Sequence, residues 1–141
     1  QNLGSLLRTA EAAGLHGVVL PERRAAGVTP AAVRSSAGAA EHVSVVQVTN
    51  LVRAMKWLKS EGMWLAGLEA VPNAQLYTEA DLRGSLGLVV GSEGQGLARL
   101  VRETCDYLIR LPMHGQVESL NAGAAGAIAL YEVLRQRTMD R

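Results

Sequence analysis

Apolar residues follow two different spacings along the chain, and the two spacings alternate. In residues 2–14 they recur every three or four positions, as on one face of a helix, with Asn2 as the cap and Gly14 as the stop. Elsewhere they form short continuous runs, which are typical of buried strands. The pattern predicts helices over residues 2–14, 30–42, 49–62 and 97–105 and from Ser119 onward, and strands over residues 17–21, 43–48, 63–69, 86–91 and 106–112.

Strands that alternate with helices indicate an α/β protein with a parallel sheet covered on both faces. The 141 residues fit one domain, residues 1–141, without a linker or a repeat. The run over residues 86–91 is apolar on both faces and predicts a central strand. Ligands of such sheets bind outside the carboxyl ends of the strands. The loops at residues 91–96 and 112–118 follow strands directly, so we expect both at that edge.

The composition is that of an ordinary globular protein, with 48% hydrophobic and 19% charged residues. A formal net charge of +1 gives little general attraction to nucleic acid, so RNA binding would need local patches. The single cysteine, Cys105, excludes an internal disulfide and favours a reducing, cytoplasmic location. No apolar run is long enough for a membrane span, and the histidines lack metal-ligand spacing, so we expect no membrane and no metal.

Three further side chains have structural interpretations. Cys105 lies among apolar residues and is expected to be a small core side chain. Trp57 and Trp64 are expected to pack in the core or at a subunit contact rather than to stack on bases.

The stretch "VVGSEGQGL" places Gly91, Gly94 and Gly96 between a strand and a helix. Glycine lets backbone N–H groups approach a ligand closely, but it also serves a tight turn that has no ligand. The spacing matches neither the dinucleotide fingerprint nor a P-loop, so nucleotide phosphates are poorly supported. Glu93 suits a hydroxyl or amino donor better than a phosphate.

The stretch "LPMHGQVESLNAGAAGA" leads into the last helix through polar residues and then through nearly bare backbone. Ser119 and Asn121 straddle the helix start, and either one suits a cap. Gly123 and Gly126 each cost a helix interior about 1 kcal/mol relative to alanine. We therefore expect another segment or a ligand to lie against this backbone.

The stretch "QNLGSLLRTA" supports two interpretations. It is typical of a capped amphipathic helix with Arg8 in solvent, and it would also provide two site residues, Asn2 and Arg8.

Together and in this order, the three stretches resemble the motifs of the SpoU or TrmH-type RNA ribose 2′-O-methyltransferases, members of the SPOUT superfamily. The resemblance covers nearly the whole chain. It implies a Rossmann-like parallel-sheet SPOUT fold with a deep C-terminal trefoil knot, S-adenosyl-L-methionine (AdoMet) as cofactor, RNA as substrate and a homodimer. The middle of the chain resembles most the branch that methylates a guanosine of 23S rRNA.

The resemblance also assigns roles to residues. Arg8 matches the arginine proposed to activate the ribose 2′-hydroxyl, although a guanidinium holds its proton tightly. Either it loses that proton beside the positively charged donor, or it stays charged and orients the hydroxyl. The other polar site residues implied are Asn2, Glu93, Ser119 and Asn121. The cofactor residues implied are Gly91, Glu93, Gly96, Leu111, Met113, Ser119, Leu120 and Asn121.

Two departures from the family pattern stand out. Ala122 and Gly123 occupy positions where the family often has Val-Ser, which removes one polar side chain near the cofactor. The strand and Asp-Pro-type turn that precede the first motif are absent, as is the small N-terminal RNA-binding domain of many members. We therefore expect the chain to be a fragment of a longer protein.

Alternatives to the 23S rRNA assignment remain. They are a tRNA 2′-O-methyltransferase, an antibiotic-resistance rRNA methyltransferase, a non-catalytic RNA-binding or ribosome-assembly factor on the same scaffold, and a nucleotide-dependent enzyme on an unknotted sheet.

Overall fold

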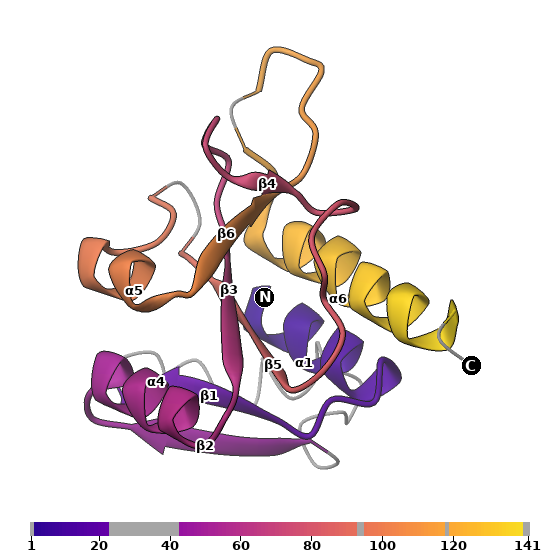
Figure 1. Ribbon diagram of the computed structural model, residues 1–141. Helices are drawn as coiled ribbons and strands as arrows, with labels where there is room; N and C mark the ends of the chain where they lie inside the picture. Colours follow the sequence, from indigo (N-terminus) through magenta and orange to yellow (C-terminus); the bar gives the residue numbers. More distant parts are fainter. Residues whose placement is uncertain (1, 23–42, 93–94, 118, 140–141) are drawn as a thin grey trace. The chain divides into compact units, whose positions relative to one another are not determined.

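The computed structural model describes residues 2–22, 43–92, 95–117 and 119–139 (Figure 1). These residues belong to two compact units, Gln1–Leu51 and Val52–Arg141. The helix predicted over residues 30–42 lies outside the described residues, as do Glu93 and Glu118.

The first unit contains helix α1 (Asn2–Ala12) and strands β1 (Gly17–Pro21) and β2 (Ser44–Val48), which pair in parallel. Leu7 of α1 is fully buried, as the helical spacing predicts. Gly14 has a φ of 75°, and the N–H of Leu15 donates to the carbonyl of Ala10, so the predicted glycine stop is confirmed. The burial predicted for β1 is wrong, because Gly17 and Val19 are exposed.

The second unit is built on a four-stranded parallel sheet in the order β4-β6-β3-β5. Gly62 ends its first helix with a φ of 94°, again as predicted. The elements in chain order are α4 (Leu51–Ser60), β3 (Trp64–Leu68), β4 (Gln75–Leu76), β5 (Leu86–Val90), α5 (Arg99–Thr104), β6 (Tyr107–Arg110) and α6 (Ala122–Met139).

The faces of this sheet are covered by different helices, α5 on one side and α6 on the other (Figure 1). Under α5, the backbone of Gly67 comes so near that a Cβ there would lie 2.8 Å from the Cys105 Sγ. On the side of the sheet that α6 covers, three residues are fully buried: Ala66 of β3, Ile109 of β6 and Ala129 of α6. The alternation of β3 between these two layers confirms the prediction of a parallel sheet with two covered faces.

Helix α6 begins at Ala122 rather than at Ser119, three residues later than predicted. Asn121 caps it, because its Oδ1 accepts hydrogen bonds from the N–H groups of Gly123 (2.8 Å) and Ala124 (3.2 Å). The geometry decides between the two candidate caps in favour of Asn121. Gly123 and Gly126 are buried, as expected of glycines whose cost in a helix is offset by close packing.

Other expectations from the sequence are corrected. β5 is an edge strand of the four-stranded sheet rather than a central one, and every residue in it is half-buried. β4, which was not predicted, lies in the segment expected to be a loop. Trp57 and Trp64 are each 61% exposed, so neither packs in the core.

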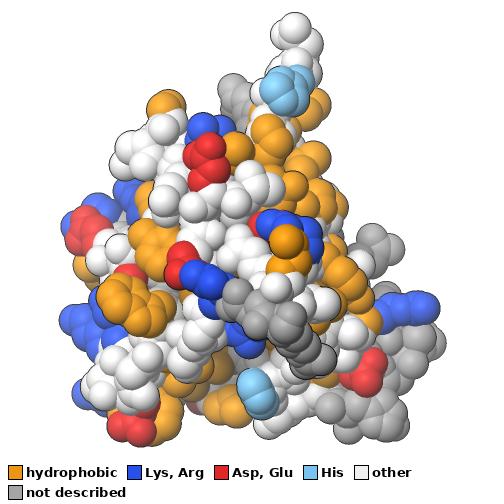
Figure 2. All heavy atoms as spheres, turned by 45° about the vertical axis from the view of Figure 1, so that its right-hand side comes forward, with side chains coloured by type: hydrophobic (Ala, Val, Ile, Leu, Met, Phe, Trp, Pro, Cys, Tyr) orange, Lys and Arg blue, Asp and Glu red, His pale blue; other side chains and the backbone are white. Residues whose placement is uncertain are grey.

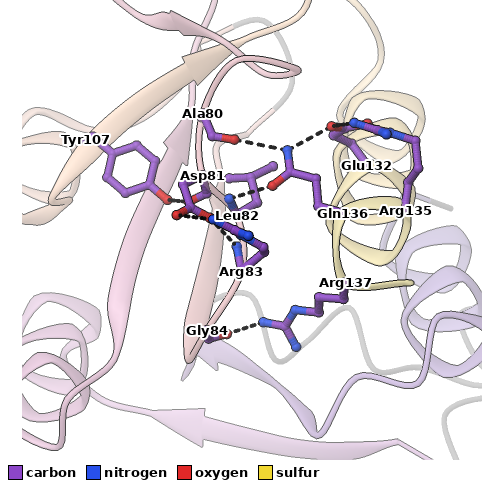
Figure 3. A network of polar contacts seen from close by, with 10 residues as sticks. All are labelled: Ala80, Asp81, Leu82, Arg83, Gly84, Tyr107, Glu132, Arg135, Gln136 and Arg137. Carbon is purple, nitrogen blue, oxygen red and sulfur yellow. Dashed lines mark hydrogen bonds and ion pairs between the residues drawn. The ribbon is translucent and has the colours of Figure 1, made fainter. Parts of the chain in front are cut away.

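The last turns of α6 are tied to the segment before β5 by a polar network (Figure 3). The Gln136 side chain accepts a hydrogen bond from the N–H of Leu82 (2.8 Å) and donates one to the carbonyl of Ala80 (3.0 Å). It also donates to Glu132, which pairs with Arg135 (2.8 Å). This hydrogen bonding lowers the pKa of the buried Glu132 carboxyl, with Arg135 as the main cause.

Among the described residues, no helix has the length and apolar character needed to cross a membrane. The trefoil knot stays a prediction.

Candidate active site

A cavity of about 280 Å³ lies in the second unit, at the carboxyl ends of β3, β5 and β6. Its walls come from the segments that follow these three neighbouring strands and from the start of α6. It therefore occupies the sheet edge at which the sequence places the loops 91–96 and 112–118. Its lining residues are Leu68, Glu69, Ala70, Val71, Val90, Gly91, Ser92, Gln95, Gly96, Leu111, Met113, Ser119, Leu120, Ala122 and Ala125.

Six of the eight residues expected to bind the cofactor line this cavity. Asn121 lies between two lining residues, and its side chain caps α6. Glu93 lies outside the described residues. The six that the structure brings together are Gly91, Gly96, Leu111, Met113, Ser119 and Leu120.

The glycine loop is a tight turn that also forms one wall of the cavity. The carbonyl of Ser92 accepts the N–H groups of Gln95 (3.3 Å) and Gly96 (3.0 Å), and Gly96 has a left-handed φ of 69°. A Cβ at Gly91 would overlap the backbone of Gly96 and lie 2.7 Å from the Leu97 nitrogen. The two interpretations of this loop are therefore compatible, since the turn needs glycine at positions 91 and 96 and these two residues also leave bare backbone at the cavity.

Glu69, which the sequence did not single out, is the acidic residue of the described lining. Its side chain is 11% exposed. One carboxylate oxygen accepts the N–H of Leu97 (3.2 Å), and the other pairs with Arg102 (3.4 Å). Glu69 could have been identified from the sequence as a polar residue directly after an apolar strand, because this position lies at the ligand-binding edge of a parallel sheet.

The residues of the first motif lie in the other unit. Arg8 is an exposed side chain of α1, and Asn2 is the first residue of that helix. The cavity is formed wholly by residues of the second unit. The assignment of Arg8 and Asn2 to the active site stays a prediction.

Cys105, His16 and His114 are not among the lining residues of the cavity. Burial, aided by the charge of Asp106, raises the pKa of the Cys105 thiol to about 11, which keeps it protonated at neutral pH. His114 is an exposed residue of the loop after β6. No cluster of His, Cys, Asp and Glu side chains with the makings of a metal site occurs in the part of the chain that the structure describes.

Helix α6 also presents apolar side chains to its surroundings. Figure 2, in which the side of the molecule that carries α6 comes forward, shows hydrophobic side chains at the surface there. Ile128, Tyr131 and Leu134 follow one another at three-residue spacing and are 42%, 47% and 36% exposed. This spacing places them along one stripe of the helix, the α6 stripe.

Comparisons with known proteins agree with the fold. A curated protein from Synechocystis sp., named as an uncharacterised tRNA/rRNA methyltransferase, is 51% identical over 99% of this chain and 36% of its own length. The SpoU methyltransferase AviRb from Streptomyces viridochromogenes, solved in complex with AdoMet, has a TM-score of 0.90 and 32% identity, over 98% of this chain and 56% of that one. A solved RNA 2′-O ribose methyltransferase has a TM-score of 0.83 and 35% identity, over 97% and 52%.

The chain spans little more than a third of this curated relative and about half of the two solved chains. The model of the SpoU rRNA Methylase family matches residues 1–131. Most of the sequence, including all three motifs up to Tyr131, lies within that match, and the chain therefore belongs to the SpoU rRNA methylase family.

Proposed function

We propose that this protein transfers the methyl group of AdoMet to the 2′-hydroxyl of a ribose in RNA. Family membership supports the proposal, as do the solved relatives, one holding AdoMet and one named for ribose 2′-O methylation. The observation that carries it is the convergence of the second and third motifs on one cavity at the ligand edge of the sheet.

The cavity suits the proposed cofactor. Its volume of about 280 Å³ is just below the roughly 300–1,000 Å³ of small-molecule sites. Gly91 contributes bare backbone to the lining, and Leu111 and Met113 offer apolar surface. Ser92 and Ser119 add hydroxyl groups to the lining, so a ligand with an apolar ring system and several polar groups fits it.

The proposed chemistry needs a polarised hydroxyl beside a methyl donor. AdoMet, when bound, would supply a methyl group on a positively charged sulfur. The ribose oxygen would attack this methyl carbon as the bond between the methyl carbon and the sulfur breaks. The proton of the hydroxyl has to leave, and the oxygen has to lie in line with the methyl group. We assign the cavity residues to binding and orientation, and Arg8 to the hydroxyl, either as its base or as a fixed cation that orients it.

The first experiment asks which atom is methylated. Full-length protein is incubated with labelled AdoMet and with unmodified rRNA or tRNA, and the modified nucleotide is mapped. We expect label on a ribose 2′-oxygen, with a guanosine of 23S rRNA as the proposed target. Label on tRNA would replace that target, and label only on a base would overturn the 2′-O assignment. Failure of the full-length protein to bind AdoMet at about millimolar concentration would favour a non-catalytic RNA-binding factor.

The role of Arg8 is tested by substitution. We expect Arg8→Ala to lower the rate of methyl transfer about 100-fold or more, the usual contribution of a positioned acid–base group. Arg99→Ala is the control, because Arg99 is an exposed arginine paired with Glu103 (3.1 Å), outside the cavity lining. A pH–rate profile of Arg8→Lys separates the two roles, since a base shifts the profile and an orienting cation does not. Near wild-type transfer by Arg8→Ala would exclude both.

We further propose that the protein acts as a homodimer. The exposed α6 stripe of Ile128, Tyr131 and Leu134 supports this, because contiguous apolar side chains at a surface mark a contact with another molecule. A second copy of the chain is the occupant we propose.

A further inference from the structure

Glu69 is a nearly buried carboxylate that none of the three motifs contains. It directly follows β3, and its own N–H donates to the carbonyl of Ile109 (3.0 Å), so its backbone is fixed to the neighbouring strand β6. Its side chain reaches toward the glycine loop that follows β5. The N–H of Leu97, the residue that ends this loop, donates to Glu69 Oε1 over 3.2 Å.

This hydrogen bond comes with a close steric fit. A Cβ built on Gly96 would overlap Glu69 Oε1, so the carboxylate occupies the space that any larger residue at position 96 would need. Glu69 is also a lining residue of the cavity, together with Gly91 and Gly96. One residue therefore both contacts the loop that forms the wall and lines the space that the wall encloses.

The ion pair with Arg102 contributes less than the hydrogen bond to the loop. Arg102 is 42% exposed and its nitrogen lies 3.4 Å from Glu69 Oε2, so water screens the pair. A nearly buried carboxylate that has one exposed partner gains most from backbone N–H donors. The two interactions can be separated experimentally, because they use different oxygens.

We propose that Glu69 is a positioning residue of the AdoMet site, which holds the glycine loop against the end of β3 and so fixes the cavity wall. The proposal rests on the proposed function. It differs from a general structural role in one respect: loss of the carboxylate should weaken cofactor binding much more than it weakens the fold.

The experiment measures AdoMet affinity by calorimetry and thermal stability on the full-length protein. We expect Glu69→Ala to weaken AdoMet binding at least about tenfold, since one charged hydrogen bond to the loop is lost. Glu69→Gln keeps an oxygen that accepts the Leu97 N–H and should recover most of the affinity. Arg102→Gln removes only the exposed ion pair and is the matched control, with affinity near that of the wild type.

Steady-state kinetics supply a second measurement. We expect Glu69→Ala to raise the KM for AdoMet while kcat and the KM for RNA change little, because the residue acts on the cofactor wall. Equal affinities of wild type and Glu69→Ala would overturn the positioning role. A wild-type protein that binds no AdoMet would instead overturn the proposed function, so the two failures are distinguishable.

A double substitution tests the contact with Gly96 directly. Gly96→Ala alone introduces two unfavourable effects, backbone strain at the left-handed φ and steric overlap with the Glu69 carboxylate. In the Glu69→Ala background the overlap is gone and only the backbone strain remains. We therefore expect Gly96→Ala to reduce AdoMet affinity by a smaller factor in that background than in the wild type. Equal factors in both backgrounds would contradict the proposed coupling.

Discussion

Cys105 follows α5 and packs against the bare backbone of Gly67 in β3. Burial raises the pKa of its thiol from 9.0 to about 11. The folded state therefore holds this proton more tightly than the unfolded chain does. The contribution of this thiol to the free energy of unfolding is fully present below about pH 9 and is lost as the pH rises through about 11.

We expect Cys105→Ala to remove part of the alkaline destabilisation. Urea unfolding at about pH 8 and at about pH 10.5 should show a smaller loss of free energy in the variant than in the wild type. The comparison is needed because burial also raises the pKa of the Tyr107 hydroxyl, and that contribution is common to both proteins. An identical pH dependence in both would contradict the assigned burial of the thiol.

Single residues were predictable where local geometry alone decides their role. Gly14 and Gly62 end helices with positive φ, which follows from their place after an amphipathic run. Asn121 was one of two candidate caps, and only the hydrogen bonds to Gly123 and Ala124 select it. Glu69 could not be paired with the glycine loop from the sequence, because that pairing depends on β3 lying beside β5.

The Gln136 network joins α6 to the segment before β5. Ala80 and Leu82 are 2% and 0% exposed, so water does not readily replace the hydrogen bonds that the Gln136 side chain makes to their backbone groups. Buried backbone groups without partners are costly.

We expect Gln136→Ala to lower the free energy of unfolding by about 1–3 kcal/mol, the cost of leaving such groups unsatisfied. Chemical denaturation measures the change. Thr138→Ala is the control, because Thr138 is an exposed residue of the same helix end whose hydroxyl bonds only within α6. A loss for Gln136→Ala no larger than that of the control would show that the network is dispensable.

The elements of the described chain were largely predictable from apolar spacing, but their neighbours were not. The run over residues 86–91 is apolar on both faces because both faces of β5 are partly covered, which does not fix how many strands flank it. β4 has only two residues, too few to show any alternation. The parallel direction was predictable because predicted helices separate most of the predicted strands.

At the scale of the whole molecule, the α6 stripe provides the test of the proposed homodimer. We expect the full-length protein to elute as a dimer in size-exclusion chromatography with light scattering. Tyr131→Glu should shift it toward the monomer, because a carboxylate in an apolar contact is strongly disfavoured. Leu100→Glu makes the same change of charge at an exposed apolar residue of α5, outside the stripe, and is the control. A wild-type monomer, or a Tyr131→Glu dimer as stable as the control, would contradict the assignment.

The whole-molecule organisation was the least accessible to sequence reasoning. Family resemblance, rather than periodicity, supplied the expectations of a cofactor, a knot and a dimer. The cavity itself could be placed at the carboxyl ends of the strands from the order of elements alone. The roles proposed for Arg8 and Asn2 rest on the resemblance as well, because both residues lie in the unit that does not form the cavity.

The bare wall at Gly91 and Gly96 has a consequence for drug resistance. Resistance to an inhibitor often arises when a mutation introduces a larger side chain at a position that the inhibitor contacts. At Gly91 any side chain would overlap the backbone of Gly96, and at Gly96 it would be strained by the left-handed φ, so a substitution that blocks the inhibitor would also strain the loop. A compound that fits closely against this wall would therefore leave the protein few escape mutations there.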